Sequence, residues 1–345
     1  MKTDPETDTQ RAIVDGIEVS LDEPCQLLPV EIPKPWGREI WYTGIEARGE
    51  SRVRVPGVAD LPLSTYLALA PAHLTRGHMP VLLKILDPLP TPVLGELYLE
   101  VHETKQEVYV VTAVDPAAWP DGRGRIRYGI NQTRRQEFAD DDAFRAAFLE
   151  ALGEYEAVRR EIDAGVNGLA EREAQARENC LAFTDERRLG IGDVIRVPTW
   201  LPHSLQQGVR VVEFQTPTYE RFILSASQKV LTQDHWDSAH AVANMRLDTP
   251  EAPEPDPVGE HCERIVRFED FGVWQARLSD GERFNLPEDI PYAVSFCISG
   301  AVHLGGPGNG LRLQAGEAAL IPAAAVGFDI RSEPDCLLLL AAPGL

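Results

Sequence analysis

The stretch ELYLEVHETKQEVYVV at residues 96–111 places three candidate metal ligands close together in the chain. Glu100 and His102 are two residues apart, so on a β-strand their side chains point to the same face. Glu107 has the wrong parity for that face if the strand runs straight. We therefore expect HETKQ (102–106) to contain a turn, with Glu107 at the start of a returning strand. The β-branched and aromatic residues that follow favour this arrangement.

A second motif, GDVIRVPTWLPH at residues 192–203, reads as a strand that ends at Pro198 and a turn that presents His203. If this strand lies beside the first two, His203 completes a set of two imidazoles and two carboxylates. Such a set is neutral when it holds a divalent cation, and it suits zinc, manganese or iron(II). Each motif alone is weak evidence, because a single Glu-x-His on a strand is most often a pair of solvated side chains. The prediction rests on their combination.

The combined pattern resembles the two-part signature of the cupin superfamily, with Glu100 in the place of the histidine that often comes first. In chain order its residues are Gly95, Glu100, His102, Glu107, Gly192, Asp193, Pro198 and His203. The stretch GEAALIPAAAVG at 316–327 repeats the order of glycine, acid, apolar strand, proline and turn, with Val326 or Gly327 in place of the histidine. These observations predict a mainly β protein with two cupin (jelly-roll) barrels, a helical insertion in the first and no metal in the second.

The domain boundaries follow from changes in sequence character. The segment 141–162 places four large apolar side chains on one helical face, namely Phe144, Phe148, Leu152 and Tyr155. A helical insertion is therefore expected at about 140–188. The stretch 248–260, DTPEAPEPDPVGE, has the composition of a linker. We predict an N-terminal arm (1–30), a metal-binding cupin domain (31–247) and a second, metal-free cupin domain (261–345).

Further strings extend the resemblance to one enzyme family. The sequence resembles the type I mannose-6-phosphate isomerases in the order of several short strings. These are LLKIL, the ExH and KxE pairs, RYGIN, GDVIRVPTWLPH and VRVVEFQTPTYER. The resemblance spans roughly Pro33 to Arg221, and more loosely the second barrel. No single string is specific, but their combined order is.

The resemblance implies a metal-dependent exchange between an aldose and a ketose, mannose 6-phosphate and fructose 6-phosphate or a related sugar. It implies one divalent metal, zinc first and manganese or iron as alternatives, on Glu100, His102, Glu107 and His203. It places Lys105 and Arg221 among the catalytic residues and Lys84 in the substrate pocket. From the residues alone, Lys105 could equally be a solvated turn residue, and Arg221 could form an ion pair with Glu220 or Asp234. Lys84 needs a partner if its apolar strand is buried.

Three features depart from the family pattern. Glu100 stands where the family has glutamine, which adds a negative charge beside the metal and favours manganese or iron. Tyr98 stands where the family has a serine that helps to hold phosphate, so it could instead stack on a sugar as a substrate-binding residue. A long family segment between the QxH and KxE pairs is missing. Two alternatives therefore stay open: an isomerase of an unphosphorylated sugar, and a non-catalytic sugar-binding or regulatory bicupin.

The composition limits the partners and the location. The formal net charge of −21 over 345 residues repels nucleic acid and anionic membrane surfaces. The five cysteines are scattered without a CxxC pair, which is typical of a reduced, cytoplasmic protein. No apolar run approaches the roughly 18 residues of a membrane span, and the acidic stretch at 1–10 is unlike a signal peptide. We expect a cytoplasmic protein whose partner is a small-molecule sugar or sugar phosphate and whose sheet edges could support a homodimer.

Overall fold

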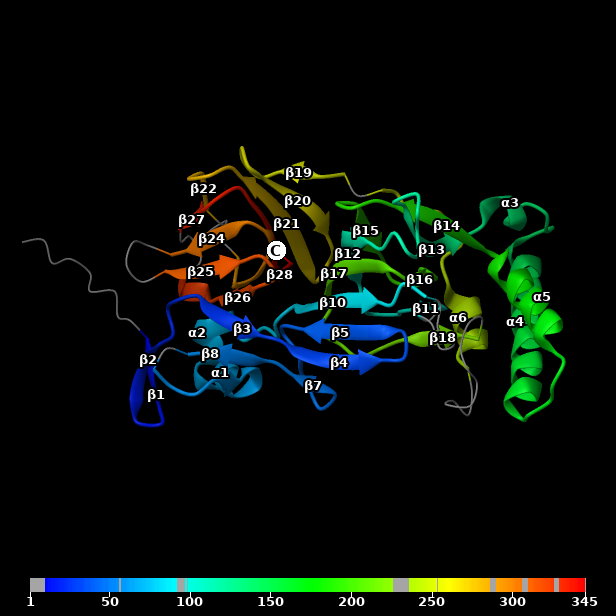
Figure 1. Cartoon of the computed structure of the whole chain (residues 1–345), viewed down its shortest axis with the longest axis horizontal. Coiled ribbons are helices and arrows are strands. Elements are labelled where there is room, and N and C mark those ends of the chain that lie inside the picture. Colours follow the sequence, from blue (N-terminus) through cyan, green and yellow to red (C-terminus); the bar gives the residue numbers. More distant parts are fainter. Residues whose placement is uncertain are drawn as a thin grey trace, which may run out of the picture.

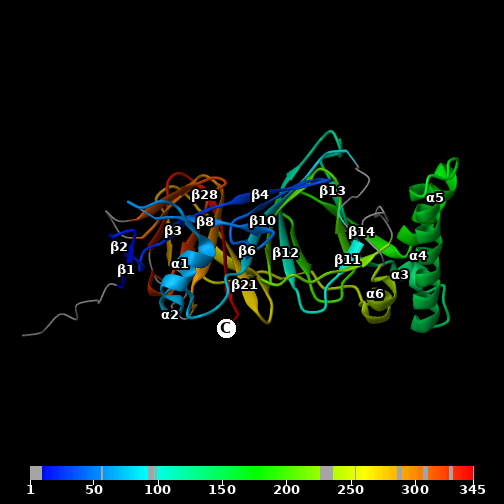
Figure 2. The same ribbon diagram turned by 90° about the horizontal axis from the view of Figure 1, so that it is seen from below.

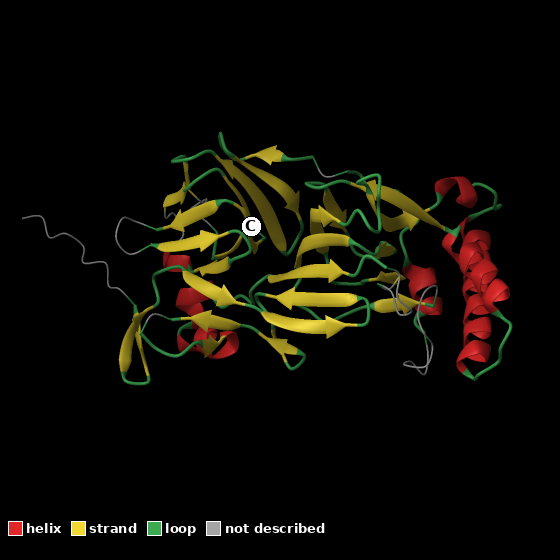
Figure 3. Cartoon of the chain, in the orientation of Figure 1, coloured by secondary structure: helices red, strands yellow, loops and turns green. Residues whose placement is uncertain are grey.

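The computed structural model describes residues 10–55, 57–91, 97, 99–225, 236–252, 254–285, 290–305, 310–325 and 329–344. Strands form most of the regular structure, and the helices gather outside the sheets (Figure 3). The mainly β fold of the cupin (jelly-roll) kind is therefore confirmed. The division into two barrels, with boundaries at 31–247 and 261–345, stays a prediction.

Two antiparallel sheets near the middle of the molecule carry the candidate ligands, and we call them the site sheets (Figure 1). The six-stranded sheet has the spatial order β15 (Val194–Val197), β12 (Glu107–Val114), β17 (Val209–Gln215), β10 (Leu82–Pro88), β5 (Gly37–Trp41), β4 (Val30–Lys34). The five-stranded sheet has the order β14 (Thr184–Leu189), β13 (Gly124–Ile130), β16 (His203–Leu205), β11 (Leu99–Val101), β18 (Phe222–Leu224).

Two further sheets, here called the C-terminal sheets, take most of their strands from residues after the predicted linker. The larger has the order β19 (Asp256–Pro257), β20 (Cys262–Arg267), β21 (Phe271–Leu278), β28 (Cys336–Pro343), β23 (Ala293–Ser299), β26 (Ala318–Ile321), β3 (Cys25–Leu28), β8 (Arg52–Arg54), β9 (Leu61–Pro62). The smaller has the order β22 (Arg283–Asn285), β27 (Asp329–Ser332), β24 (Ala301–Leu304), β25 (Leu311–Gln314). Both β15 and β26, the strands of the predicted internal repeat, are followed by proline.

Alternate residues of β10, β12 and β17 face opposite sides of the six-stranded sheet. One side joins the large apolar core that the six-stranded sheet shares with the C-terminal sheets, through Leu83, Ile85, Val108, Val110, Val212 and Phe214. The other side faces the five-stranded sheet and presents polar and aromatic side chains, among them Lys84, Glu107, Tyr109 and Glu213. Because both sides are buried, each strand is mainly apolar, with a charged residue inside β10 and β17 and at the start of β12.

The helices lie at the edges of the sheets. They are α1 (Leu63–Leu69), α2 (Pro71–Thr75), α3 (Gln132–Arg135), α4 (Asp141–Asp163), α5 (Ala170–Leu181) and α6 (Ser238–Asn244), with a 3-10 helix η2 (Ala323–Ala325). The α4–α5 pair stands at one end of the molecule, beyond the five-stranded sheet (Figure 2). No helix in the described part of the chain is long and apolar enough to cross a membrane.

Helix α4 begins where the sequence indicates and buries the predicted face. The Asp140 carboxylate accepts a hydrogen bond from the N–H of Ala143 (2.8 Å), which caps the helix. The four apolar side chains expected on one face are all buried in a core that includes α5 and the outer side of the five-stranded sheet. The segment 140–188 therefore contains both helices and also most of β14.

Strands from the N-terminal segment complete the C-terminal sheets. β3, which lies within the predicted arm 1–30, pairs with β26 on one side and with β8 on the other. Ahead of it, β1 (Arg11–Val14) and β2 (Ile17–Ser20) form a separate two-stranded sheet. A second small sheet, β6 (Ile45–Glu46) with β7 (Gly49–Glu50), follows β5.

Tyr292 ties the C-terminal sheets to the segment that leads into β10. Its hydroxyl donates to the carbonyl of Met79 (2.9 Å) and accepts from the N–H of Val81 (2.8 Å). The side chain is fully buried. A single hydroxyl thus satisfies two backbone groups at the junction between the two groups of sheets.

We expect Tyr292→Phe to lower the free energy of unfolding by about 1–3 kcal/mol, because the buried N–H of Val81 loses its acceptor. Urea denaturation would measure the change. The matched control is Tyr219→Phe, since Tyr219 is 60% exposed and losing its hydroxyl should change stability by less than about 0.5 kcal/mol. Equal stability of the two variants would contradict the bridging role of Tyr292.

Candidate metal centre

The register of the six-stranded sheet lines up four inward-facing side chains across four strands. Lys84 lies opposite Trp41 on one side and opposite Glu213 on the other, and Glu213 lies opposite Tyr109. Glu107, two residues before Tyr109 on β12, therefore faces the same interior. This row forms one wall of the candidate site.

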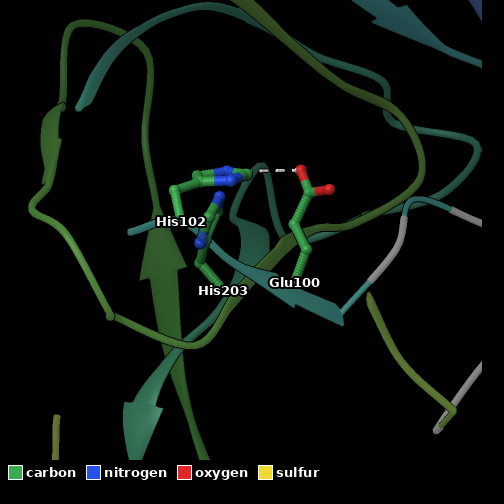
Figure 4. A group of neighbouring side chains, drawn as sticks. All are labelled: Glu100, His102 and His203. Atoms are coloured by element: carbon green, nitrogen blue, oxygen red, sulfur yellow. Dashed lines mark ion pairs between the residues drawn. The ribbon is translucent and has the colours of Figure 1, made fainter. Parts of the chain in front are cut away.

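The four predicted ligands come together between the site sheets. Glu100 on β11 lies directly opposite His203 on β16, and His102 follows the end of β11. Glu107 begins β12 in the other sheet, after a turn within 102–106, as expected from its parity. One ligand atom each of Glu100, His102 and His203 lies within 4.8 Å of the others, so this group could hold a metal ion (Figure 4).

Glu107 contacts both histidines of this group. Its Oε1 lies 3.5 Å from Nε2 of His102, and its Oε2 lies 3.2 Å from Nε2 of His203. Nε2 of His102 is also 3.6 Å from Oε1 of Glu100. Glu107 therefore contacts both imidazoles, but it is not one of the three residues whose ligand atoms all lie within 4.8 Å of one another.

The hydrogen bonding of His102 fits a metal ligand. Both of its ring nitrogens are buried, and neither has a hydrogen-bond partner among the described residues. The same is true of the buried Oε2 of Glu100. Burial, together with the charge of Lys105, holds the pKa of His102 well below its usual range. The neutral ring keeps a nitrogen lone pair, and a bound cation would account for these otherwise unpaired polar atoms.

His203 is oriented by its neighbours. Its Nδ1 hydrogen bonds to the carbonyl of Leu201 (2.9 Å), which leaves Nε2 directed at Glu107. Burial opposes a charge on this ring, but the hydrogen bond and negative charge of Glu107 prevail and raise the pKa of His203. Glu107 thus stabilises the protonated ring when no cation is bound.

Glu107 has two further partners. Lys105 Nζ lies 2.5 Å from its Oε1, and the hydroxyl of Tyr109 donates to its Oε2 (2.5 Å). Burial alone would raise the pKa of Glu107, but Lys105 and His102 lower it well below its usual range. Burial and the neighbouring carboxylate raise the pKa of Tyr109, so it stays a hydroxyl donor.

Trp200 links the two histidine segments through an unusual backbone conformation. Its φ is 62°, in the left-handed region that a bulky side chain rarely adopts. Its N–H donates to the carbonyl of His102 (2.6 Å). Its ring stacks on Phe222 of β18, with centroids 5.8 Å apart and planes at 7°. Tertiary contacts therefore hold a strained turn three residues before His203.

A cavity of about 100 Å³ opens beside these residues. Glu100, Glu107 and His203 line it, and so do the predicted residues Lys84, Lys105 and Arg221. The predicted substrate-binding residue Tyr98 lies outside the described residues, as does Asp234. Glu220 accepts a hydrogen bond from the N–H of Thr104 (3.1 Å).

The partner that Lys84 requires is Glu213, whose Oε1 lies 3.2 Å from Nζ. Burial alone would lower the pKa of Lys84, but the carboxylates of Glu213 and Glu39 raise it. Burial raises the pKa of Glu213, against the opposing charge of Lys84. Neither Glu213 nor Glu39 was expected in the site. The available signal for Glu213 is an acidic residue inside the mainly apolar strand VRVVEFQ, of opposite sign to the lysine in LLKIL.

The fold and the site together define the class: a cupin-type β protein with histidine and carboxylate side chains gathered between two sheets. No protein-family model matches the sequence, and no curated protein matches it. Solved structures do match, and several phosphomannose isomerases are among them.

A mutant phosphomannose isomerase from Salmonella typhimurium aligns over 94% of this chain and 100% of its own, with a TM-score of 0.71 and 14% identity. The mannose 6-phosphate isomerase from Bacillus subtilis aligns over 92% and 99%, with a TM-score of 0.64 and 17% identity. A zinc-bound mannose 6-phosphate isomerase aligns over 94% and 100%, with a TM-score of 0.71 and 14% identity. The chain therefore has the fold of the phosphomannose isomerases.

We expect Trp200→Gly to weaken binding of cobalt(II) by about 10- to 100-fold, because the ring that fixes the turn before His203 is lost. Trp200→Phe, which keeps an aromatic ring against Phe222, should retain most of the affinity. Cobalt titrations followed by visible absorption would measure both. If the glycine variant binds as tightly as the unsubstituted protein, the stacking does not position the site.

We expect cobalt binding to weaken as the pH falls through the raised pKa of His203, which lies above 6.5, because a metal needs the neutral ring. In the metal-free protein, protonation of His203 has the opposite effect, because there it favours the folded state. The contact between His203 and Glu107 stabilises the fold below pH 6.5, and that contribution is lost as the pH rises through the raised pKa. Titrations between about pH 5.5 and 8 would cover this window, and an affinity that does not change with pH would contradict the expectation.

Proposed function

We propose that this protein is a metal-dependent aldose–ketose isomerase that acts on a sugar phosphate, with mannose 6-phosphate and fructose 6-phosphate as the first pair to test. The observation that carries the proposal is the group of Glu100, His102 and His203, with Glu107 in contact with both imidazoles, beside a cavity lined by buried ion pairs. The phosphomannose isomerase fold supports the same reading.

In this proposal the four residues hold one divalent metal. Two imidazoles suit zinc, and one isomerase of similar fold is zinc-bound. Two carboxylates leave manganese and iron(II) as alternatives. The metal would supply Lewis acidity to stabilise negative charge on the sugar oxygens.

The chain's own residues would bind the sugar and move its proton. Lys105, beside Glu107, would stabilise the charge that develops when a proton leaves the carbon next to the carbonyl. Arg221, which also lines the cavity, would act on the substrate from the opening. Lys84 and Glu213 form a buried acid–base pair facing the cavity, so either can hold a proton near the sugar.

One observation favours a second candidate, an isomerase of an unphosphorylated sugar. Each lysine that lines the cavity is already paired with a buried or nearly buried carboxylate. A phosphate placed deep in the cavity would have to compete with these carboxylates. A non-catalytic sugar-binding bicupin remains the third alternative, and the cytoplasmic location and a homodimer stay predictions.

The test is metal content by elemental analysis, followed by interconversion of mannose 6-phosphate and fructose 6-phosphate. We expect about one metal ion per chain, and we expect His102→Ala to lose the metal and at least about 100-fold of the rate. The control is His303→Ala, since His303 pairs with Glu333 in the C-terminal sheets and should keep both properties.

The outcomes separate the candidates. Bound metal with turnover of mannose but not of mannose 6-phosphate would select the unphosphorylated sugar. Bound metal with sugar binding and no turnover would select the binding protein. A purified protein that contains no metal, and takes up none when zinc, manganese or iron(II) is added, would overturn the proposal.

A further inference from the structure

The cations that line the cavity fall into an inner and an outer set. The inner set is three lysines, each paired with a carboxylate on the cavity wall: Lys34 with Glu39 (3.3 Å), Lys84 with Glu213 (3.2 Å) and Lys105 with Glu107 (2.5 Å). Their charges are already balanced inside the cavity. The outer set is Arg48 and Arg221. Arg48 also pairs with a carboxylate, that of Glu46, but Glu46 is not among the residues that line the cavity.

Arg48 reaches the cavity from the short turn between β6 and β7. Its guanidinium carbon lies 3.8 Å from the centroid of the Tyr219 ring and 5.2 Å from that of Trp41. Tyr219 is 60% exposed, so this contact lies at the opening. Two segments distant in sequence, the β6–β7 turn and the loop before β18, thus meet there through a cation–π interaction.

The guanidinium of Arg48 is held on one edge and on one face. Its Nε donates to Oε2 of Glu46 (2.9 Å), and Nη2 donates to the same oxygen. Among the described residues, nothing accepts a hydrogen bond from Nη1. A planar group fixed in this way presents its remaining edge in a defined direction without losing further side-chain freedom on binding.

The nearby acid at the opening is engaged elsewhere. The Glu220 carboxylate accepts hydrogen bonds from the N–H and hydroxyl of Thr104 and from the N–H of Glu103. It is therefore directed at the turn after β11. The guanidinium carbon of Arg221 lies 5.9 Å from the centroid of the same Tyr219 ring. The open edge of Arg48 is thus available to a ligand that enters past Tyr219.

We propose that Arg48 is a specificity-determining residue, which binds an anionic group at the end of the sugar remote from the reacting carbons. The group is a phosphate or a carboxylate, because both accept the parallel hydrogen bonds that a guanidinium edge donates. The inference rests on the proposed function, since the metal centre fixes which end of the substrate lies deep. Arg48 would distinguish acidic sugars from neutral ones.

The test uses ligands that have no carbonyl and cannot be isomerised. Binding of a hexitol 6-phosphate, of a reduced uronic acid and of the neutral hexitol is measured by calorimetry on the metal-loaded protein. We expect Arg48→Ala to weaken binding of at least one anionic ligand by about 10- to 100-fold and to leave the neutral hexitol within about twofold. The control Arg54→Ala removes the same charge from β8, where Arg54 is exposed and pairs with Gln26.

The proposal is tested by which ligands bind more weakly to Arg48→Ala. Loss for the phosphate alone or for the carboxylate alone identifies the anionic group. The role of Arg48 would be overturned if Arg48→Ala weakened binding of charged and neutral ligands equally, or weakened none of them. It would also be overturned if the unsubstituted protein bound all three ligands equally well. Failure of isomerase activity is a separate result, because a chain that binds hexitol 6-phosphate through Arg48 without turnover keeps the subsite and loses only the proposed reaction.

Discussion

The buried pair of Lys84 and Glu213 is the constraint around which the site is organised. Each charge is buried on a mainly apolar strand, and removing one partner from such a buried pair costs about 3–5 kcal/mol. β10 and β17 must therefore pair in the register that places Lys84 opposite Glu213. That register also places Glu107 and Tyr109 on the inner face of β12, because β12 pairs with the other edge of β17. The strand pairing that neutralises Lys84 therefore also positions Glu107 and Tyr109 at the candidate metal centre.

Much of this could be predicted from the sequence, because the relevant signals are local. The parity of Glu100 and His102, the turn before Glu107 and the proline before His203 each constrain a few neighbouring residues. The apolar face of α4 follows from its period in the same way. A lone lysine in LLKIL correctly indicated that a buried counter-charge must exist. These features need no knowledge of which distant strands are neighbours.

The remainder depends on long-range pairing, which no local pattern encodes. Glu213, Glu39 and Arg48 join the site only because β17, β5 and the β6–β7 turn lie beside β10 or the opening. Trp200 adopts a conformation that the residue type disfavours, and only its stacking on Phe222 explains why it is tolerated. β3, expected in an arm or edge strand, is an inner strand of the largest sheet, because its partners come from both ends of the chain.

That placement of β3 has a consequence for the order of folding. The Cys25 thiol donates to the carbonyl of Leu320, a contact across 295 positions in the chain. During synthesis β3 can pair with β8, but its other edge must wait for β26 until nearly the whole chain has been made. Cutting the chain at the linker would leave the C-terminal fragment without β3, β8 and β9. The two halves are therefore obligate folding partners, and the molecule gains its cooperativity from a sheet that its two termini build together.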